Sequence, residues 1–319
     1  MRLLKLVPDN TQFRFVRLRW VAFTLTLLLT LSSVALLATR GLNMGVDFVG
    51  GLMIETGFEQ PVKLDTLRSK INHLGVGEAS LQQFGNDRTV AIRLPLPPGD
   101  DAAVQAVVKK VQAAVVSDYP GASFRRVDTV SGKVSGELIS DGIKAVVLAM
   151  LGIAIYSWFR FEWHFGVSTL VALFHDVVVT LGFFSLTRME FDLNIVAAIL
   201  TIVGYSLNDK IVIDDRIREN LRKYRKMEIG ELIDLSVNET LPRTVMTSLS
   251  MVLALGSLLL LGGEVIRGFT AAMLLGIVIG TYSSIYVSSS LLISLGVGSQ
   301  TFGPKEEKSG AERIAKRQG

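Results

Sequence analysis

An aspartate lies near the end of one apolar stretch of the sequence, in the triplet Asn208-Asp209-Lys210. The apolar run before it, Leu193–Leu207, has about 15 residues, fewer than the roughly 20 that a helix needs to cross a bilayer. The helix must therefore continue past the triplet, which places Asp209 about one turn inside the membrane. Ionisable side chains are costly there and usually serve a function such as proton transfer. The alternative interpretation is that the triplet is interfacial.

An arginine, Arg243, follows Pro242 at the start of the next apolar stretch. Asp209 and Arg243 enter from the same side, at similar depth, on consecutive predicted helices. A buried carboxylate ionises beside a cation and otherwise tends to keep its proton. A pair whose separation changes can therefore take up and release protons, with Asn208 in the same pathway. The simpler interpretation is that Arg243 snorkels to the membrane surface.

Two further groups of residues inside apolar stretches are candidates for a role. His175 and Asp176 lie in the third stretch, where an accessory function and a structural role are equally compatible with the sequence. Gly276, Gly280 and Ser284 repeat every four residues in the last stretch. Small residues at this spacing allow close contact between helices, so we interpret this stripe as a packing surface.

Six apolar stretches are long enough to span a bilayer. They cover residues 20–38, 138–158, 164–186, 193–213, 245–262 and 268–297. The sequence therefore predicts a mainly α protein built as a bundle of six transmembrane helices. Its composition agrees, because 49% of the residues are hydrophobic and only 19% are charged, against about 25% charged in a soluble chain.

Lys and Arg gather in three places: residues 1–19, 216–226 and 305–317. Six crossings put all three on one side, which the positive-inside rule identifies as the cytoplasm. Four regions follow: an N-terminus with the first helix (1–40), a periplasmic domain (41–135), helices two to six (136–298) and a basic cytoplasmic tail (299–319). In this interpretation the chain is a multi-pass protein of the bacterial inner membrane.

The insert at 41–135 shows the alternation of strands and the spacing of helices. Residues 50–58, 79–84, 89–94 and 122–127 are predicted strands, and two apolar stripes, over 64–74 and 104–115, are predicted helices. The order is βαββαβ, as in α+β ferredoxin-like domains. Gly85-Asn86-Asp87 is the predicted turn between the middle strands.

Several classes of function have no support in the sequence. There is no Cys, so thiol chemistry is excluded. No nucleotide-binding loop, metal-ligand spacing or nucleophile motif occurs, and we expect no enzyme activity, no cofactor and no metal. The basic charge is explained by membrane orientation, so we expect no nucleic-acid partner.

At this point the motifs resemble those of a known family, the SecF subunits of the SecD/SecF family within the RND superfamily. The similar segments are Gly41–Gly51, Val134–Leu138, Ala172–Val177, Ala198–Asp209, Asp215–Asn220 and the pairs Arg243-Thr244 and Thr247-Ser248. The resemblance covers about residues 10–300. It implies that the chain forms one half of a complex with SecD, beside SecYEG, SecA and YajC. It also implies that the complex uses the proton-motive force to move unfolded preproteins across the membrane after SecA and SecYEG have acted, with Asp209 and Arg243 in proton passage.

Two departures from the family pattern stand out. Lys210 replaces a frequent Thr, and Ser131-Gly132 replaces a frequent Gly-Pro. Lys210 points about 100° away from Asp209 on a helix, so it need not occupy the pathway, although it can perturb ionisation of that carboxyl. Two alternatives to protein export remain: a proton-driven small-molecule exporter of the same superfamily, and a membrane scaffold, for which a buried Asp209 has no purpose.

Overall fold

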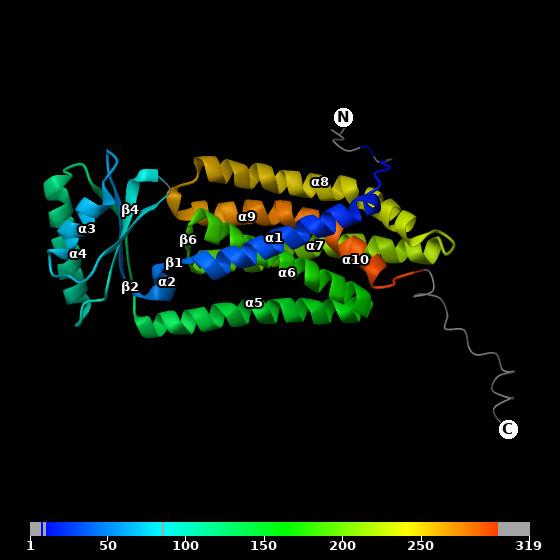
Figure 1. Ribbon diagram of the computed structural model, residues 1–319, viewed down its shortest axis with the longest axis horizontal. Helices are drawn as coiled ribbons and strands as arrows, with labels where there is room; N and C mark the ends of the chain where they lie inside the picture. Colours follow the sequence, from blue (N-terminus) through cyan, green and yellow to red (C-terminus); the bar gives the residue numbers. More distant parts are fainter. Residues whose placement is uncertain (1–7, 9–10, 85, 299–319) are drawn as a thin grey trace, which may run out of the picture.

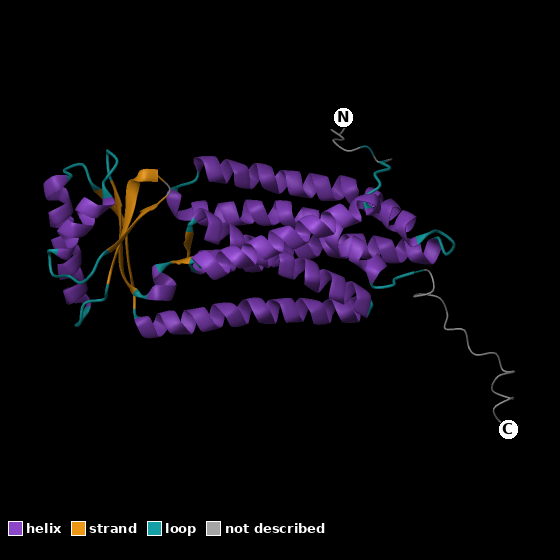
Figure 2. Cartoon of the chain, in the orientation of Figure 1, coloured by secondary structure: helices purple, strands orange, loops and turns teal. Residues whose placement is uncertain are grey.

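Long helices form most of the chain and run side by side (Figures 1 and 2). The computed structural model describes residues 8, 11–84 and 86–298. The basic tail 299–319 and the first basic residues, Arg2 and Lys5, lie outside this part of the chain. The long helices are α1 (Arg19–Arg40), α5 (Gly132–Arg160), α6 (Trp163–Thr187), α7 (Leu193–Lys223), α8 (Ile229–Leu261) and α9 (Glu264–Tyr282). A π-helical turn, η2 (Ser283–Ser288), and α10 (Ser289–Ser294) continue α9.

Six helices in the described part of the chain are long and apolar enough to cross a membrane. The predicted mainly helical architecture with six spans is therefore confirmed. The helices are longer than the apolar stretches that predicted them. Most notably, α8 begins at Ile229 rather than near residue 245, so Arg243 lies inside this helix and not at its start.

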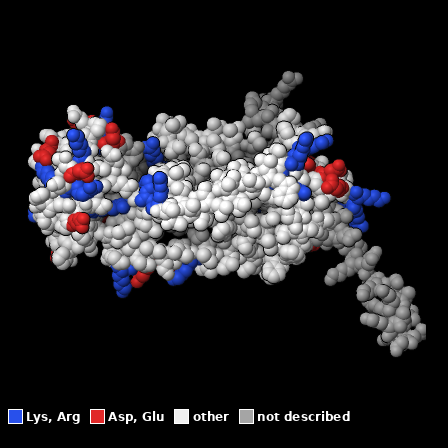
Figure 3. All heavy atoms as spheres, in the orientation of Figure 1, with Lys and Arg blue, Asp and Glu red and all other residues white. Residues whose placement is uncertain are grey.

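The outward side chains of the bundle are largely apolar, which suits contact with lipid. Trp20, Leu28, Leu148, Phe159 and Leu260 are all exposed. In Figure 3 most charged side chains on the visible face gather at the two ends, with a largely uncharged belt between them. Helix α6 differs from the others because it lies at the centre of the bundle, and most of its residues are buried.

The smaller domain is a four-stranded sheet with two helices on the side away from the bundle (Figure 1). Its elements are β2 (Gly51–Gly57), α3 (Leu64–Asn72), β3 (Ser80–Phe84), β4 (Asn86–Leu94), α4 (Asp101–Asp118) and β5 (Ser123–Val130). The strands lie in the order β3-β4-β2-β5, and all neighbours are antiparallel. Gly85 of the predicted turn lies outside the described residues.

Successive residues of a strand point to opposite faces of the sheet, so this sheet packs against other side chains on both faces. Leu52 and Ile54 of β2 point into a core with Leu67 of α3 and Val111 of α4. Met53, between them, faces the other way, where it packs with Ala91. Gly51, with φ of 111°, allows the chain to enter the sheet, because a Cβ there would lie 2.6 Å from the carbonyl oxygen of Leu94.

Short elements tie the sheet domain to the bundle. Strand β1 (Asn43–Met44) pairs in parallel with β6 (Glu190–Phe191), and α2 (Val46–Val49) leads from β1 towards the sheet. Arg93 of the sheet forms an ion pair with Glu190 at 2.9 Å. Burial beneath the sheet raises the pKa of Glu190 above its ordinary value, although Arg93 opposes this shift. Glu190 is thus partly desolvated at the junction.

Candidate functional site

Asp209 lies on α7, where two hydroxyl groups from neighbouring helices hold its carboxylate. Thr244 of α8 donates to Oδ1 at 2.5 Å, and Ser284 of η2 donates to Oδ2 at 2.6 Å. Both donors are buried, and Asp209 itself is half-buried. No ion pair to Asp209 occurs in the described part of the chain. The site is therefore a carboxylate held by neutral hydroxyl donors from two neighbouring helical elements.

The structure does not bring Arg243 to Asp209, contrary to the expectation from their depth. Thr244, the next residue of α8, faces Asp209 instead, because successive residues of a helix are about 100° apart. Arg243 and Asn208 are both exposed on the isolated chain. The two residues assigned with Asp209 to a proton pathway therefore lie beside it on the surface, open to a partner or to water.

This exposed surface carries an unusual share of polar and small groups for a membrane span. It comprises Thr201, Gly204 and Asn208 of α7 with Arg243, Thr247 and Ser250 of α8, which we call the α7–α8 face. Polar side chains are unfavourable against lipid. The α7–α8 face therefore differs from the apolar belt and is suited to contact with another protein.

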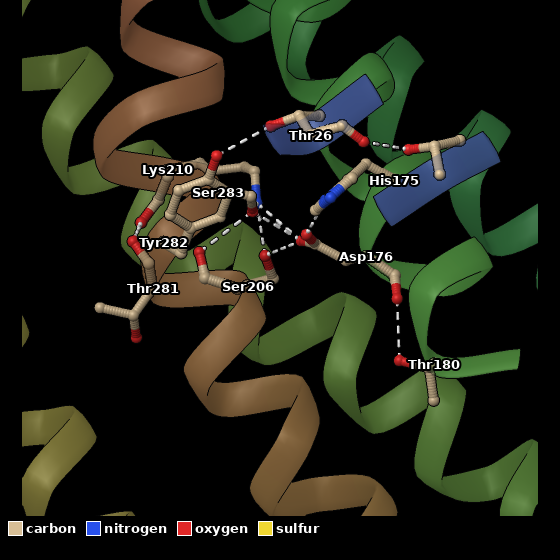
Figure 4. A network of polar contacts seen from close by, with 12 residues as sticks. Thr26, His175, Asp176, Thr180, Ser206, Lys210, Thr281, Tyr282 and Ser283 are labelled. Atoms are coloured by element: carbon tan, nitrogen blue, oxygen red, sulfur yellow. Dashed lines mark hydrogen bonds and ion pairs between the residues drawn. The ribbon is translucent and has the colours of Figure 1, made fainter. Parts of the chain in front are cut away.

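A second cluster of charged residues is fully buried behind α7 (Figure 4). Lys210 and Asp176 are each 0% exposed, and their Nζ and Oδ2 atoms lie 3.1 Å apart. Ser206 and Ser283 complete the cluster: each donates to Asp176 Oδ2, at 2.6 Å and 2.8 Å respectively. Lys210 donates in turn to both hydroxyls, to Ser283 at 2.9 Å.

His175 lies beside this cluster, as its position next to Asp176 implies. Its Nδ1 atom is 3.1 Å from Asp176 Oδ1. The buried Nε2 atom has no hydrogen-bond partner among the residues that the structure describes. Tyr282, whose ring lies 6.3 Å from that of His175, donates to the carbonyl oxygen of Ala22 and so connects the cluster to α1. The two candidate accessory residues therefore belong to one network, although only Asp176 lies at its centre.

Lys210 points away from Asp209, as its position on the helix predicts, and this direction takes it into the core of the bundle, where it contacts Asp176. Asp214 was not singled out from the sequence; it is 1% exposed and accepts a hydrogen bond from Thr169 at 3.5 Å. A signal was available: Ser206, Lys210 and Asp214 repeat every four residues and so share one face of α7.

The two clusters lie back to back across α7 and η2. Asp209 and Lys210 are consecutive residues of α7, and Ser283 and Ser284 are consecutive residues of η2. Ser283 bonds to Asp176, and Ser284 bonds to Asp209. The π-helical geometry of this turn, a feature often found at functional sites, thus connects both carboxylates through adjacent serines.

Helix packing supports this arrangement through the predicted small stripe of α9. A Cβ at Gly276 would lie 2.4 Å from the side chain of Ile202, and one at Gly280 would lie 3.0 Å from Ser206 Oγ. Both glycines therefore face α7, and their small size lets the backbones approach. Ser284 has a polar role in addition to its small size, since it bonds to Asp209.

Comparisons with known proteins agree on one family. The family model "Protein export membrane protein SecD/SecF, C-terminal" matches residues 109–298, and the "SecD/SecF GG Motif" model matches residues 35–62. The chain is 42% identical over 290 residues to the protein translocase subunit SecF of Rickettsia akari, covering 91% of this chain and 94% of that protein. For the Vibrio alginolyticus subunit SecF the identity is 43%, covering 93% and 95%.

A solved structure is also similar. It is SecDF from Thermus thermophilus, described as a translocon-associated membrane protein, with a TM-score of 0.82 and 36% identity. The match covers 91% of this chain but only 39% of the Thermus chain.

Proposed function

We propose, since the chain belongs to the SecD/SecF family of protein export membrane proteins, that it forms the SecF-type half of a complex with SecD. The relatives of similar length are named protein translocase subunit SecF. The solved SecDF chain is more than twice as long as the part that matches here, which leaves room in it for a second half. The partner that completes this chain is therefore a SecD-type protein.

The α7–α8 face supports this assignment and is the surface that we assign to SecD. Its polar side chains lie on two of the helices that are long and apolar enough to cross a membrane, and Gly204 at its centre has no atom within 4 Å of the position of a Cβ. Small residues at helix interfaces let a second helix approach closely. Docking of SecD would remove Asn208 and Arg243 from lipid and enclose Asp209 between the two halves.

The energy source that fits this site is the proton-motive force. Asp209 is the proton-binding group in our proposal, with Asn208 and Arg243 lining the path at the interface. When Arg243 swings towards Asp209, the charged carboxylate is favoured; when it moves away, the proton is retained. Such a cycle needs no nucleotide, cofactor or enzymatic step, and it can drive movement of the sheet domain through the junction of β1 with β6.

The proposal includes an orientation and a place in export. The sheet domain, of ferredoxin-like type, faces the periplasm, and both termini lie in the cytoplasm, in accord with the basic segments. The complex sits in the inner membrane beside SecYEG, SecA and YajC. It acts on unfolded preprotein that has already passed the channel.

Depletion of the chain from cells that make a secreted reporter tests this function. We expect unprocessed precursor to accumulate and the chain, supplied again, to relieve the defect. Sensitivity to small toxic compounds with normal secretion would instead support the exporter alternative. Loss of neither property would contradict both transport functions and favour a scaffold.

Two glycine substitutions test the assignment of SecD to the α7–α8 face. Gly204→Leu is expected to leave the thermal stability of the isolated chain unchanged but to weaken copurification with SecD about tenfold or more, because overpacking costs about 1–3 kcal/mol. Gly276→Leu is the matched control: it should destabilise the chain itself through its clash with Ile202. Normal copurification of the Gly204→Leu chain would mean that SecD binds elsewhere.

A further inference from the structure

The cluster around Lys210 is separate from Asp209 and has no role in the proposed proton path. Its central feature is the coordination of one positive charge. Lys210 Nζ contacts three oxygens from three elements: Asp176 Oδ2 of α6, Ser206 Oγ of α7 and Ser283 Oγ of η2. The ammonium thus has an acceptor for each of its three protons.

We propose that the Lys210 ammonium is a tethered counter-ion filling what would otherwise be a binding site for a monovalent inorganic cation. The three oxygens form a cage of one carboxylate and two hydroxyls, and oxygen donors of this kind suit hard cations. The serines are already oriented for such an ion. Each gives its proton to Asp176, at 2.6 Å and 2.8 Å, and turns a lone pair towards Nζ.

The balance of charge shows why this place requires a cation. Asp176 is fully buried, and Lys210 is the cation in contact with it, with Nζ 3.1 Å from Oδ2. His175 faces Asp176 on the other side, through Oδ1. Asp209 is directed away, towards Thr244 and Ser284. Removal of the Lys210 charge therefore leaves the buried Asp176 carboxylate with its hydroxyl donors but without its cation, a costly state that binding of a free cation relieves.

In this chain, the side chain of residue 210 thus determines whether the stability of the bundle depends on a dissolved cation. With lysine, the cage is always occupied, and the stability does not depend on which cation is in solution. With a short neutral side chain, the same cage requires an inorganic cation. This inference concerns ion binding by the chain alone and does not rest on the proposed function.

Thermal unfolding of the purified full-length chain in detergent tests the inference. The chain, its Lys210→Thr variant and the double variant Lys210→Thr/Asp176→Asn are compared in NaCl, LiCl, KCl and N-methylglucamine chloride at equal ionic strength. The native chain should melt at the same temperature in all four salts. Lys210→Thr should melt about 3 °C or more higher in at least one inorganic salt than in the organic one. The double variant, which lacks the carboxylate, should show no such difference.

Two controls keep the result interpretable. Lys223→Thr removes an exposed lysine of the same helix and should behave as the native chain does. Lys210→Gln retains more of the side-chain volume and serves if the threonine variant does not melt cooperatively. Equal melting temperatures of the Lys210 variants in all salts would overturn the proposal, as would an equal salt effect in the double variant. Failure of both variants to fold in every salt would overturn it too, since a free ion would then be unable to replace Lys210.

Discussion

Asp209→Asn should abolish the stimulation of preprotein translocation by a proton gradient while the chain still inserts and accumulates normally. Asparagine has nearly the same shape, and its amide oxygen can accept the hydrogen bond of one of the two hydroxyls that now donate to Asp209, while its NH2 group donates to the other hydroxyl oxygen. It cannot bind and release a proton. We expect the gradient-dependent rate to fall at least about tenfold, to that of membranes lacking the chain. The measurement is translocation into inverted membrane vesicles that contain the chain with SecD.

A matched carboxylate and a conservative change make this result specific. Asp215 lies on the same helix but is exposed and paired with Arg160 at 3.3 Å, so Asp215→Asn should retain nearly full activity. Asp209→Glu keeps a titratable group and should retain part of it. Full translocation by the Asp209→Asn chain would show that this carboxyl is structural, and the proton pathway would have to be placed elsewhere.

Hydropathy was sufficient to predict the six helices, because a helix that crosses a bilayer needs about 20 mostly apolar residues. It was insufficient to predict where they end. Helix α8 begins at Ile229, and its first turns include Glu231 and Asp234. These turns are stabilised by burial of Leu232 and Ile233 against other helices. Such contacts are tertiary, and an apolar run cannot reveal them.

In the candidate site, too, positions along the chain could be predicted from the sequence, whereas contacts between helices could not. Asp209 could be singled out from the sequence because the apolar stretch before it is too short to span a bilayer by itself, and its role stays a prediction. The direction of Arg243 was not, since it depends on the rotation of α8 about its axis. Lys210 was judged only relative to Asp209, whereas its partner Asp176 lies 34 residues away on α6. The spacing of Ser206, Lys210 and Asp214 marks a polar face of α7, but only the fold supplies what that face contacts.

Asp176→Ala should destabilise the chain by about 3–5 kcal/mol, because it leaves the buried Lys210 ammonium without its carboxylate. Both side chains are fully buried, so water cannot replace the lost partner. The loss is measured as the free energy of unfolding of the purified chain in detergent. As a control, Asp65→Ala breaks an ion pair with Arg68 in which the aspartate is 95% exposed, and it should cost less than about 1 kcal/mol.

The double variant Asp176→Ala/Lys210→Met separates loss of the pair from loss of packing. Replacing a buried ion pair with apolar groups of similar volume is often neutral, whereas removing one partner is costly. The double variant should therefore recover most of the stability lost in Asp176→Ala, with a coupling free energy of about 2 kcal/mol or more. If the losses of stability in Asp176→Ala and Lys210→Met simply add in the double variant, Lys210 and Asp176 do not stabilise each other. The contacts among α6, α7 and η2 would then depend on the serine hydroxyls and on Asp214, and not on the charge of Lys210.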